Sequence, residues 1–284
     1  MTRWKIFFFA AIFAVAGISA YAFRADLRER WYAVSAPSVP VAIRFSPPRG
    51  IGIEQTSLIE EGVATSQHFM LVTSPSVRTH KAVDPFAIHG LLPNELNLAV
   101  PFTSQAPTGE WALPYQEACE EASAIMVDAF YRGETGRIPP DVATKAITNL
   151  VAFEKKILGF YEDTSALDTA KFIKAYFGYP TVMIQPLTSE SELKRAIANG
   201  YPVIIPAAGK LLPNPYFRAG GPLYHMLVVK GYTKDRIITN DPGTKRGADF
   251  TYTFDQLKHA AHDWNGGDVM HGAPVMLVVI PKAS

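Results

Sequence analysis

Cysteine is almost absent from this sequence of 284 residues, which contains a single one, Cys119. One thiol cannot form a disulfide within the chain or build a metal site from cysteine ligands. An excess of charge is also lacking, because 27 Lys and Arg residues stand against 26 Asp and Glu residues. Nucleic-acid binding needs many unopposed cations, so we expect no nucleic-acid partner.

Apolar residues, by contrast, are abundant. Hydrophobic residues make up 48% of the sequence and aromatic residues 12%, which is enough for a packed core and excludes a wholly disordered chain. The length allows one large domain, or one moderate domain with an appendage.

The N-terminal segment Ile6–Phe23 is uncharged and follows two basic residues, Arg3 and Lys5. As a helix it would span about the 30 Å hydrocarbon core of a bilayer. The same pattern describes a signal peptide, and Ala20–Ala22 resembles a cleavage site. We expect residues 1–24 to be a transmembrane anchor or a signal peptide. The anchor is preferred because the apolar segment is longer than the core of a usual signal peptide. The rest of the chain is then outside the cytoplasm, either tethered to the membrane or secreted or periplasmic.

Residues 25–95 show no sustained period and are rich in proline. We interpret them as a spacer, or as an extended segment wrapped on the main domain, with short strands at Val39–Phe45 and His68–Val72.

Residues 96–284 alternate between helical and strand patterns. Helices are expected at Cys119–Tyr131, Asp141–Ile157 and Ser165–Phe177, from Ser189 to Gly200, and at Asp255–Trp264. Strands are expected at Tyr201–Ala207, Tyr224–Tyr232, Arg236–Asn240, Phe250–Phe254 and Ala273–Ile280. Helices followed by a mostly antiparallel sheet predict an α+β fold.

Cys119 lies where the chain enters its first amphipathic helix. The positive end of the helix dipole favours a thiolate at that place. A buried structural cysteine on the apolar face of the helix is the alternative.

His225 lies at the start of an expected strand, and the next strand ends in Asn240 and Asp241. In an antiparallel hairpin these ends come face to face, so His225 and either Asn240 or Asp241 become neighbours. Such a partner fixes the histidine tautomer. A structural histidine and an ordinary Asp-Pro-Gly turn are the alternatives. The order Cys, His, Asn/Asp is typical of nucleophilic acyl transfer.

Several motifs in this order resemble the C39-like branch of the papain-fold cysteine peptidases. They are Val100–Gln105, Trp111, Cys119–Ser123, Tyr224–Tyr232 and Asn240–Gly243. The resemblance covers about residue 96 to the C-terminus and implies a papain-like fold.

The resemblance also implies roles. Cys119 matches the nucleophile, His225 the general base and acid, and Asp241 the residue that orients the histidine. Gln105 matches the glutamine that stabilises the oxyanion, although it lies further upstream than usual, which leaves Gln116 as a rival.

The chain departs from the family pattern at Glu120, which stands where many members have glycine. A carboxylate beside the nucleophile opposes thiolate formation unless it is turned away.

Two other features give weaker evidence of a functional site. His259, His262 and His271, with Asp263 and Asp268, lack a convincing third ligand, so no metal site is expected. The segment Ala208–Phe217 lacks the pattern of a phosphate loop and forms either a wall of the active-site cleft or an ordinary surface connection.

The resemblance therefore implies a cysteine peptidase that cleaves a peptide or protein substrate through an acyl-enzyme and needs no metal or organic cofactor. Members that process leader peptides are fused to transporters, and that role is not implied here because the chain has no nucleotide-binding motif. Two alternatives are an inactive binding module at the cell surface and another amide hydrolase, such as a deamidase or a cell-wall peptide hydrolase.

Overall fold

The computed structural model describes residues 23, 27, 30, 33–34, 36–44, 84–87 and 91–281. The expected anchor or signal segment lies outside these residues apart from Phe23, and so does the expected strand His68–Val72. Among the helices of the described ranges, none is both long and apolar enough to cross a membrane. Within the described part of the expected strand Val39–Phe45, one bridge forms, between Ile43 and Leu98.

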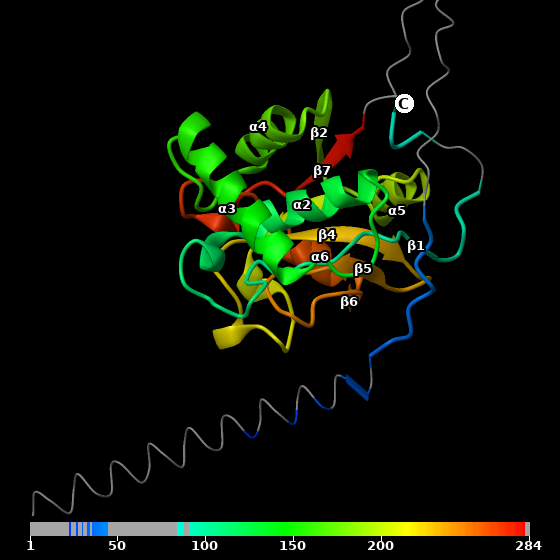
Figure 1. Ribbon diagram of the computed structural model, residues 1–284. Helices are drawn as coiled ribbons and strands as arrows, with labels where there is room; N and C mark the ends of the chain where they lie inside the picture. The colour runs from blue at the N-terminus through cyan, green and yellow to red at the C-terminus, as the bar shows by residue number, and fades with distance from the viewer. Residues whose placement is uncertain are drawn as a thin grey trace, which may run out of the picture.

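A seven-stranded sheet forms the centre of the molecule (Figure 1). The strands are β1 Leu96–Asn97, β2 Thr181–Pro186, β3 Val203–Ala207, β4 His225–Tyr232, β5 Ile237–Asn240, β6 Phe250–Tyr252 and β7 Val275–Ile280. Their order is β2-β7-β3-β4-β5-β6, with β1 also paired to β4, and every pair is antiparallel. The predicted α+β class with an antiparallel sheet is confirmed, while β1 and β2 were not predicted.

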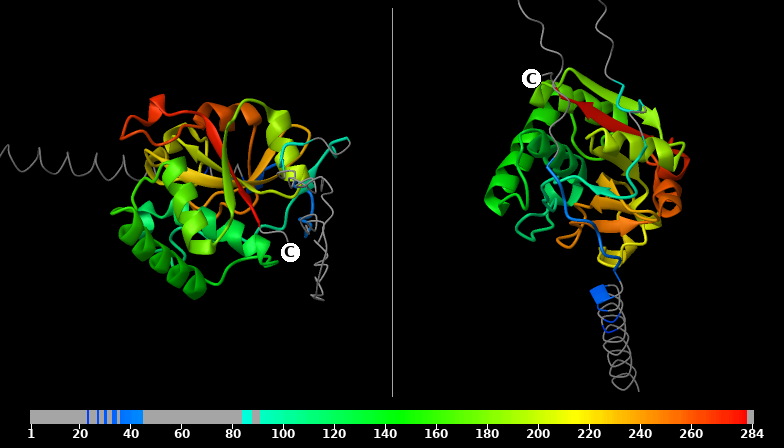
Figure 2. Two further views of the ribbon diagram at one scale, coloured as in Figure 1. Left: turned by 90° about the horizontal axis from the view of Figure 1, so that it is seen from above. Right: turned by 90° about the vertical axis from the view of Figure 1, so that its right-hand side faces the viewer.

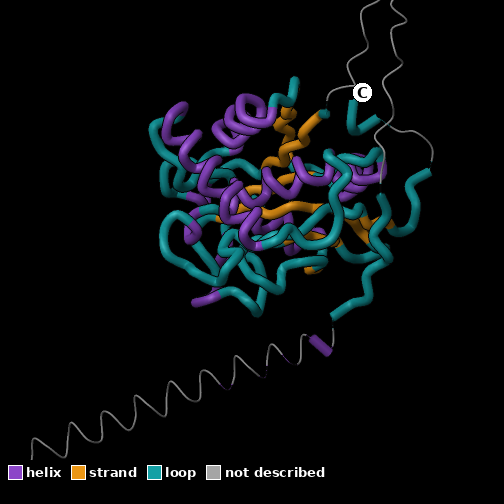
Figure 3. The backbone as a smooth tube through the Cα atoms, viewed as in Figure 1, coloured by secondary structure: helices purple, strands orange, loops and turns teal. Residues whose placement is uncertain are grey.

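Helices cover both faces of this sheet (Figures 2 and 3). They are α2 Cys119–Tyr131, α3 Pro140–Ile157, α4 Ala166–Phe177, α5 Glu190–Ala198 and α6 Phe254–Ala260. The first three lie on one side and α5 and α6 on the other. Because helices cover both sides, every residue of β3 and β4 is buried, which accounts for their continuous apolar runs.

Helix α2 has the predicted bounds, but its burial exceeds the prediction. The sequence showed one apolar stripe, whereas every residue from Cys119 to Phe130 is buried. The helix packs on β4 with one side and against α3 and α4 with the other. Glu120 and Glu121 are therefore enclosed in the interior although they are charged residue types.

The helix ends follow the capping signals in the sequence. The side chain of Ser165 accepts a hydrogen bond from the N–H of Asp168 and begins α4, and Gly178, with φ of 75°, ends it. Ser189 begins α5 in the same way. The helix expected at Asp255–Trp264 is shorter, because α6 ends at Ala260.

Parts of the proline-rich segment lie against the domain. The N–H of Ile43 donates to the carbonyl of Asn97 at 2.7 Å, and the Asn97 side chain donates to the carbonyl of Pro40 at 3.0 Å. Further along, the Asn199 side chain donates to the carbonyl of Pro85 at 2.8 Å. Residues 36–44 and 84–87 are thus held to the domain surface at these points.

Candidate active site

Cys119 is the first residue of α2 and follows a short 3-10 helix, η1 Tyr115–Glu117. The cap residue Ala118 offers no side-chain hydrogen bond, so the first N–H groups of the helix are left to other acceptors. The helix dipole favours a thiolate here, but the side chain is only 5% exposed. Burial raises the pKa of the Cys119 thiol well above its ordinary value, and the charge and hydrogen bond of Glu120 raise it further. The resting thiol is therefore protonated.

His225 begins β4, and Asp241 follows directly after β5, so the sheet brings them together. The distance from Nε2 of His225 to Oδ1 of Asp241 is 2.8 Å, and both residues are fully buried. The sequence left Asn240 and Asp241 as alternatives at this place. Asn240 instead donates to the carbonyls of Val100 and Pro101.

The carboxylate of Asp241 is held by several donors. Its Oδ2 accepts from the hydroxyl of Tyr252 at 2.8 Å and from Nδ2 of Asn214 at 3.1 Å. Its Oδ1 accepts from the N–H of Gly243 at 3.0 Å. Burial alone would raise the pKa of Asp241, but the charge of His225 and these hydrogen bonds hold it below its ordinary value. Asp241 therefore stays ionised and fixes the imidazole.

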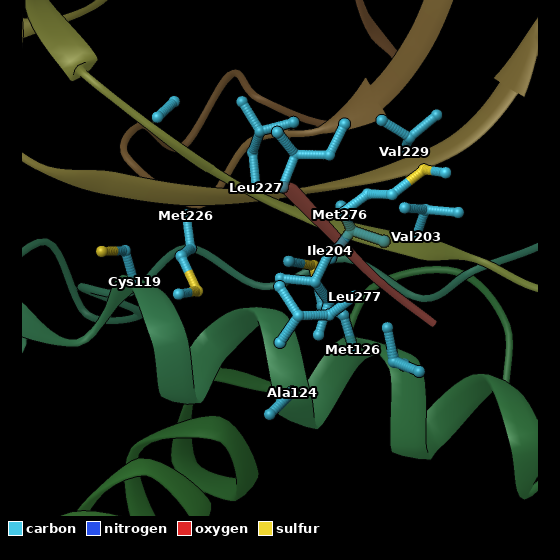
Figure 4. Close-up of a cluster of buried hydrophobic side chains, with 14 of the residues drawn as sticks. Cys119, Ala124, Met126, Val203, Ile204, Met226, Leu227, Val229, Met276 and Leu277 are labelled. Atoms are coloured by element: carbon cyan, nitrogen blue, oxygen red, sulfur yellow. The ribbon is translucent and has the colours of Figure 1, made fainter. Parts of the chain in front are cut away.

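Cys119 and His225 are neighbours through Met226. The backbone of Met226, the residue after His225, donates a hydrogen bond to Sγ of Cys119. Figure 4 shows Cys119 at the start of α2 beside Met226. The thiol itself donates to Oε2 of Glu120 at 2.9 Å, while Nδ1 of His225 has no hydrogen-bond partner. The elements of a Cys-His-Asp arrangement are adjacent, with the thiol turned to Glu120.

Gln105 is brought to this place although it lies 14 residues before Cys119 in the chain. Its N–H donates to the carbonyl of Pro242 at 3.0 Å, just after Asp241. Its side-chain Nε2 donates to the carbonyls of Tyr115 and Gln116, at 3.0 and 2.8 Å. Both side-chain N–H groups are used in this state, so an oxyanion would have to displace one of these carbonyls.

The sequence profile of the family described as Peptidase_C39 like matches residues 97–267, more than half of the chain. The chain belongs to this family. A solved structure from Bacillus anthracis, of a protein provisionally described as a C39-like peptidase, is 16% identical with a TM-score of 0.45. The match covers 68% of this chain and 100% of that one. No curated protein matches this chain.

In this C39-like chain, a cleft of about 640 Å³ adjoins His225. Phe217 lines it, and its ring meets the imidazole of His225 edge-on, with 5.3 Å between ring centroids. Gly243 also lines it, and a Cβ there would lie 2.9 Å from Cε1 of His225. Only glycine leaves room for the imidazole at that position. Phe217 is the last residue of the segment Ala208–Phe217, whose end therefore walls the cleft.

The cleft of the C39-like domain also carries charge. Glu117 and Asp163 line it, together with the exposed Arg218. Burial, together with the charges of Glu117 and Glu162, raises the pKa of Asp163 to about 6. The charge on this wall consequently changes between mildly acidic and neutral pH.

Other buried acids of this C39-like domain were not found from the sequence. Glu121 on α2 and Glu154 on α3 are 0% exposed, and none of their four carboxyl oxygens has a hydrogen-bond partner. Burial raises the pKa of Glu154 to about 9 and that of Glu121 well above its ordinary value. Glu154 falls on the buried face of α3, so its helical position was the available signal.

The histidines near the C-terminus do not gather. Nδ1 of His271 is paired with the carboxylate of Asp268, and Nδ1 of His262 lies 3.1 Å from the carbonyl of Gly272. Across the described residues, no three His, Cys, Asp or Glu side chains come together as a metal site would require.

Proposed function

We propose that this chain is a papain-like cysteine peptidase that cleaves peptide bonds through Cys119, His225 and Asp241. The observation that carries the proposal is the buried His225–Asp241 pair beside the start of α2. Nδ1 of His225 in this pair is unpaired, and the next residue, Met226, contacts the thiol of Cys119. The family match supports the same chemistry.

Each group has a defined task in the reaction. Asp241 accepts a hydrogen bond from Nε2 and so leaves Nδ1 of His225 as the proton acceptor. Nδ1 takes the thiol proton of Cys119, and the thiolate attacks the peptide carbonyl. The imidazolium then returns that proton to the leaving amine. Water, deprotonated by the same Nδ1, attacks the thioester and releases the acid, which restores the free thiol.

The oxyanion of the tetrahedral intermediate needs hydrogen-bond donors. The backbone N–H of Cys119 at the start of α2 can supply one, since the first N–H groups of a helix have no acceptor within it. We assign a second to Gln105, once its amide exchanges a backbone carbonyl for the oxyanion. The rival Gln116 donates to the side chain of Glu117 at 2.8 Å.

The first experiment is hydrolysis of a diverse peptide pool, with cleavage products identified by mass spectrometry. Changing Cys119→Ala, His225→Asn or Asp241→Asn should lower kcat/KM by a factor on the order of 10³ or more. His271→Asn is the matched control, because it removes an exposed histidine that also pairs with an aspartate. An unchanged product pattern with Cys119→Ala would refute the peptidase.

A second candidate function is a binding module without catalysis. The thiol bonded to Glu120, and its raised pKa, favour it. The module predicts peptide binding, measured by calorimetry, without cleavage products. A deamidase would instead release ammonia with no new peptide ends, which the same mass spectra distinguish.

We further propose that the catalytic domain acts on a peptide or protein outside the cytoplasm, tethered through residues 1–24 or released after their cleavage. The basic and apolar pattern of those residues supports this. Cell fractionation with protease added to intact cells tests it. A domain that is protected until the cells are lysed would contradict export.

A further inference from the structure

Glu120 holds the candidate nucleophile with one oxygen and the neighbouring loop with the other. Its Oε2 accepts the thiol of Cys119 at 2.9 Å, and its Oε1 accepts the backbone N–H of Thr164 at 3.1 Å. Glu120 is 1% exposed and Thr164 is fully buried. The carboxyl group is therefore fixed on both sides, between the start of α2 and the loop that joins α3 to α4.

His225 and Asp241 already have the arrangement that catalysis requires, and only the thiol of Cys119 is not yet bonded to them. Nε2 of His225 is bonded to Asp241, and Nδ1 is buried without a hydrogen-bond partner. A buried ring nitrogen without a partner is unfavourable, so Nδ1 is ready to accept a hydrogen bond. Because Met226 already contacts Sγ, the thiol is next to the histidine and bonded elsewhere.

We propose that Glu120 is a positioning residue that holds the protonated Cys119 thiol in a resting orientation. Before attack, the thiol must exchange its hydrogen bond to Glu120 for one to Nδ1 of His225. In the exchange the S–H···O hydrogen bond to Glu120 breaks. The S–H proton then passes to Nδ1, where a new N–H bond forms, and a thiolate–imidazolium pair remains. Glu120 keeps its bond to Thr164 throughout. The inference rests on the proposed function, because it takes Cys119 as the nucleophile.

The electrostatic surroundings favour this resting state. The titratable groups whose interactions involve Glu120 are Cys119, Glu117, Glu121, Glu154, Asp163 and Tyr224. Within the described part of the chain, no Lys, Arg or His side chain forms an ion pair with Glu120. Burial and the adjacent carboxyl of Glu120 disfavour a thiolate, and no neighbouring cation in the described ranges offsets them, so the thiol remains neutral until it leaves Glu120.

The single cysteine makes a direct test possible. In the full-length chain labelled with ¹³C at the cysteine Cβ, one resonance reports the titration of Cys119. We expect a midpoint above that of a free thiol in the wild type. Glu120→Gln keeps the side-chain shape and removes the charge, so the midpoint should fall by at least one pH unit. Burial raises the pKa of Glu120 to about 8, so its charge is mostly present at pH 9, and alkylation by iodoacetamide at pH 9 should be about tenfold faster in Glu120→Gln.

Glu121→Gln is the matched control. Glu121 is the adjacent residue, is equally buried and makes no hydrogen bond to the thiol. We expect it to change the alkylation rate by about threefold or less. Glu120→Asp keeps the charge and withdraws the oxygen, so its midpoint should lie between those of the wild type and Glu120→Gln. Thermal unfolding of each variant establishes that it is folded. If Glu120→Gln does not fold, the comparison between the wild type and Glu120→Asp decides the test.

An unchanged or higher midpoint in Glu120→Gln would overturn the proposal, as would an equal shift in Glu121→Gln. If the Asp variant carries the test, a midpoint equal to that of the wild type would overturn it. The titration needs no substrate. A chain that hydrolyses no peptide would therefore refute the proposed function, while the role of Glu120 in holding the thiol is still decided by these midpoints.

Discussion

The buried carboxyl groups of Glu121 and Glu154 should make the stability of this domain fall at alkaline pH. With no hydrogen-bond partner for any of their oxygens, both groups are stable in the interior only when protonated. The perturbation that tests this is Glu154→Gln, which keeps nearly the same volume and cannot ionise.

The size of the effect follows from the pKa of Glu154, which burial raises from 4.5 to about 9. The native state binds this proton more tightly than the unfolded state does. Its contribution to stability is therefore complete below the unfolded pKa, near 4.5, and is lost as the pH rises through about 9. Within that window the free energy of unfolding falls by about 1.4 kcal/mol per pH unit, or about 3 kcal/mol between pH 6 and pH 8. Glu121 adds a slope of the same sign, because its pKa is also raised.

The assay is urea unfolding followed by circular dichroism at several pH values from 6 to 9. Burial also raises the pKa of Glu120, to about 8, so in the wild type we expect a loss that approaches three protons and in Glu154→Gln a slope that is smaller by about one proton. Glu110→Gln, at an exposed position, is the control and should follow the wild type. Equal slopes in the wild type and in Glu154→Gln would refute the reasoning, and so would a wild type that gains stability over this range.

Three further predictions concern the cleft and the histidine. Gly243→Ala places a Cβ 2.7 Å from Cε1 of Phe217 and 2.9 Å from Cε1 of His225, so kcat for peptide hydrolysis should fall by a factor on the order of 10 to 100 and the melting temperature should fall as well. Tyr252→Phe removes a donor to the buried carboxylate of Asp241 and should lower the free energy of unfolding by about 1–3 kcal/mol, measured by denaturant unfolding at pH 7. Asp163 ionises as the pH rises through about 6, so KM for an amine-bearing peptide should fall over that range in the wild type and stay constant in Asp163→Asn.

Local signals predicted most of the helices. The bounds of α2 were predicted without error, and the cap at Ser165 and the stop at Gly178 fixed α4, because these signals act within a few residues. Strand β2, Thr181–Pro186, was missed, since a short apolar run after a proline can be a strand or a loop. Its place beside β7 is set by pairing with a distant segment.

The order of the site residues along the chain was predictable, and so was the contact made within one hairpin, but contacts between distant segments were not. The hairpin argument correctly placed His225 next to the end of the following strand, and the register decided for Asp241. Asn214 is 27 residues from Asp241, and no local pattern connects them. The direction in which the Glu120 side chain turns is likewise set by Thr164, 44 residues away.

The hydrogen bond between Cys119 and Glu120 also bears on how a lone thiol survives. Peroxide attacks the thiolate and hardly the neutral thiol, and damage proceeds through sulfenic acid to irreversible acids. A thiol that is 5% exposed and kept protonated by burial and an adjacent carboxyl is a poor target for that chemistry. For a chain exported as proposed, this resting state would slow the oxidation of Cys119 in the intervals when no substrate is bound.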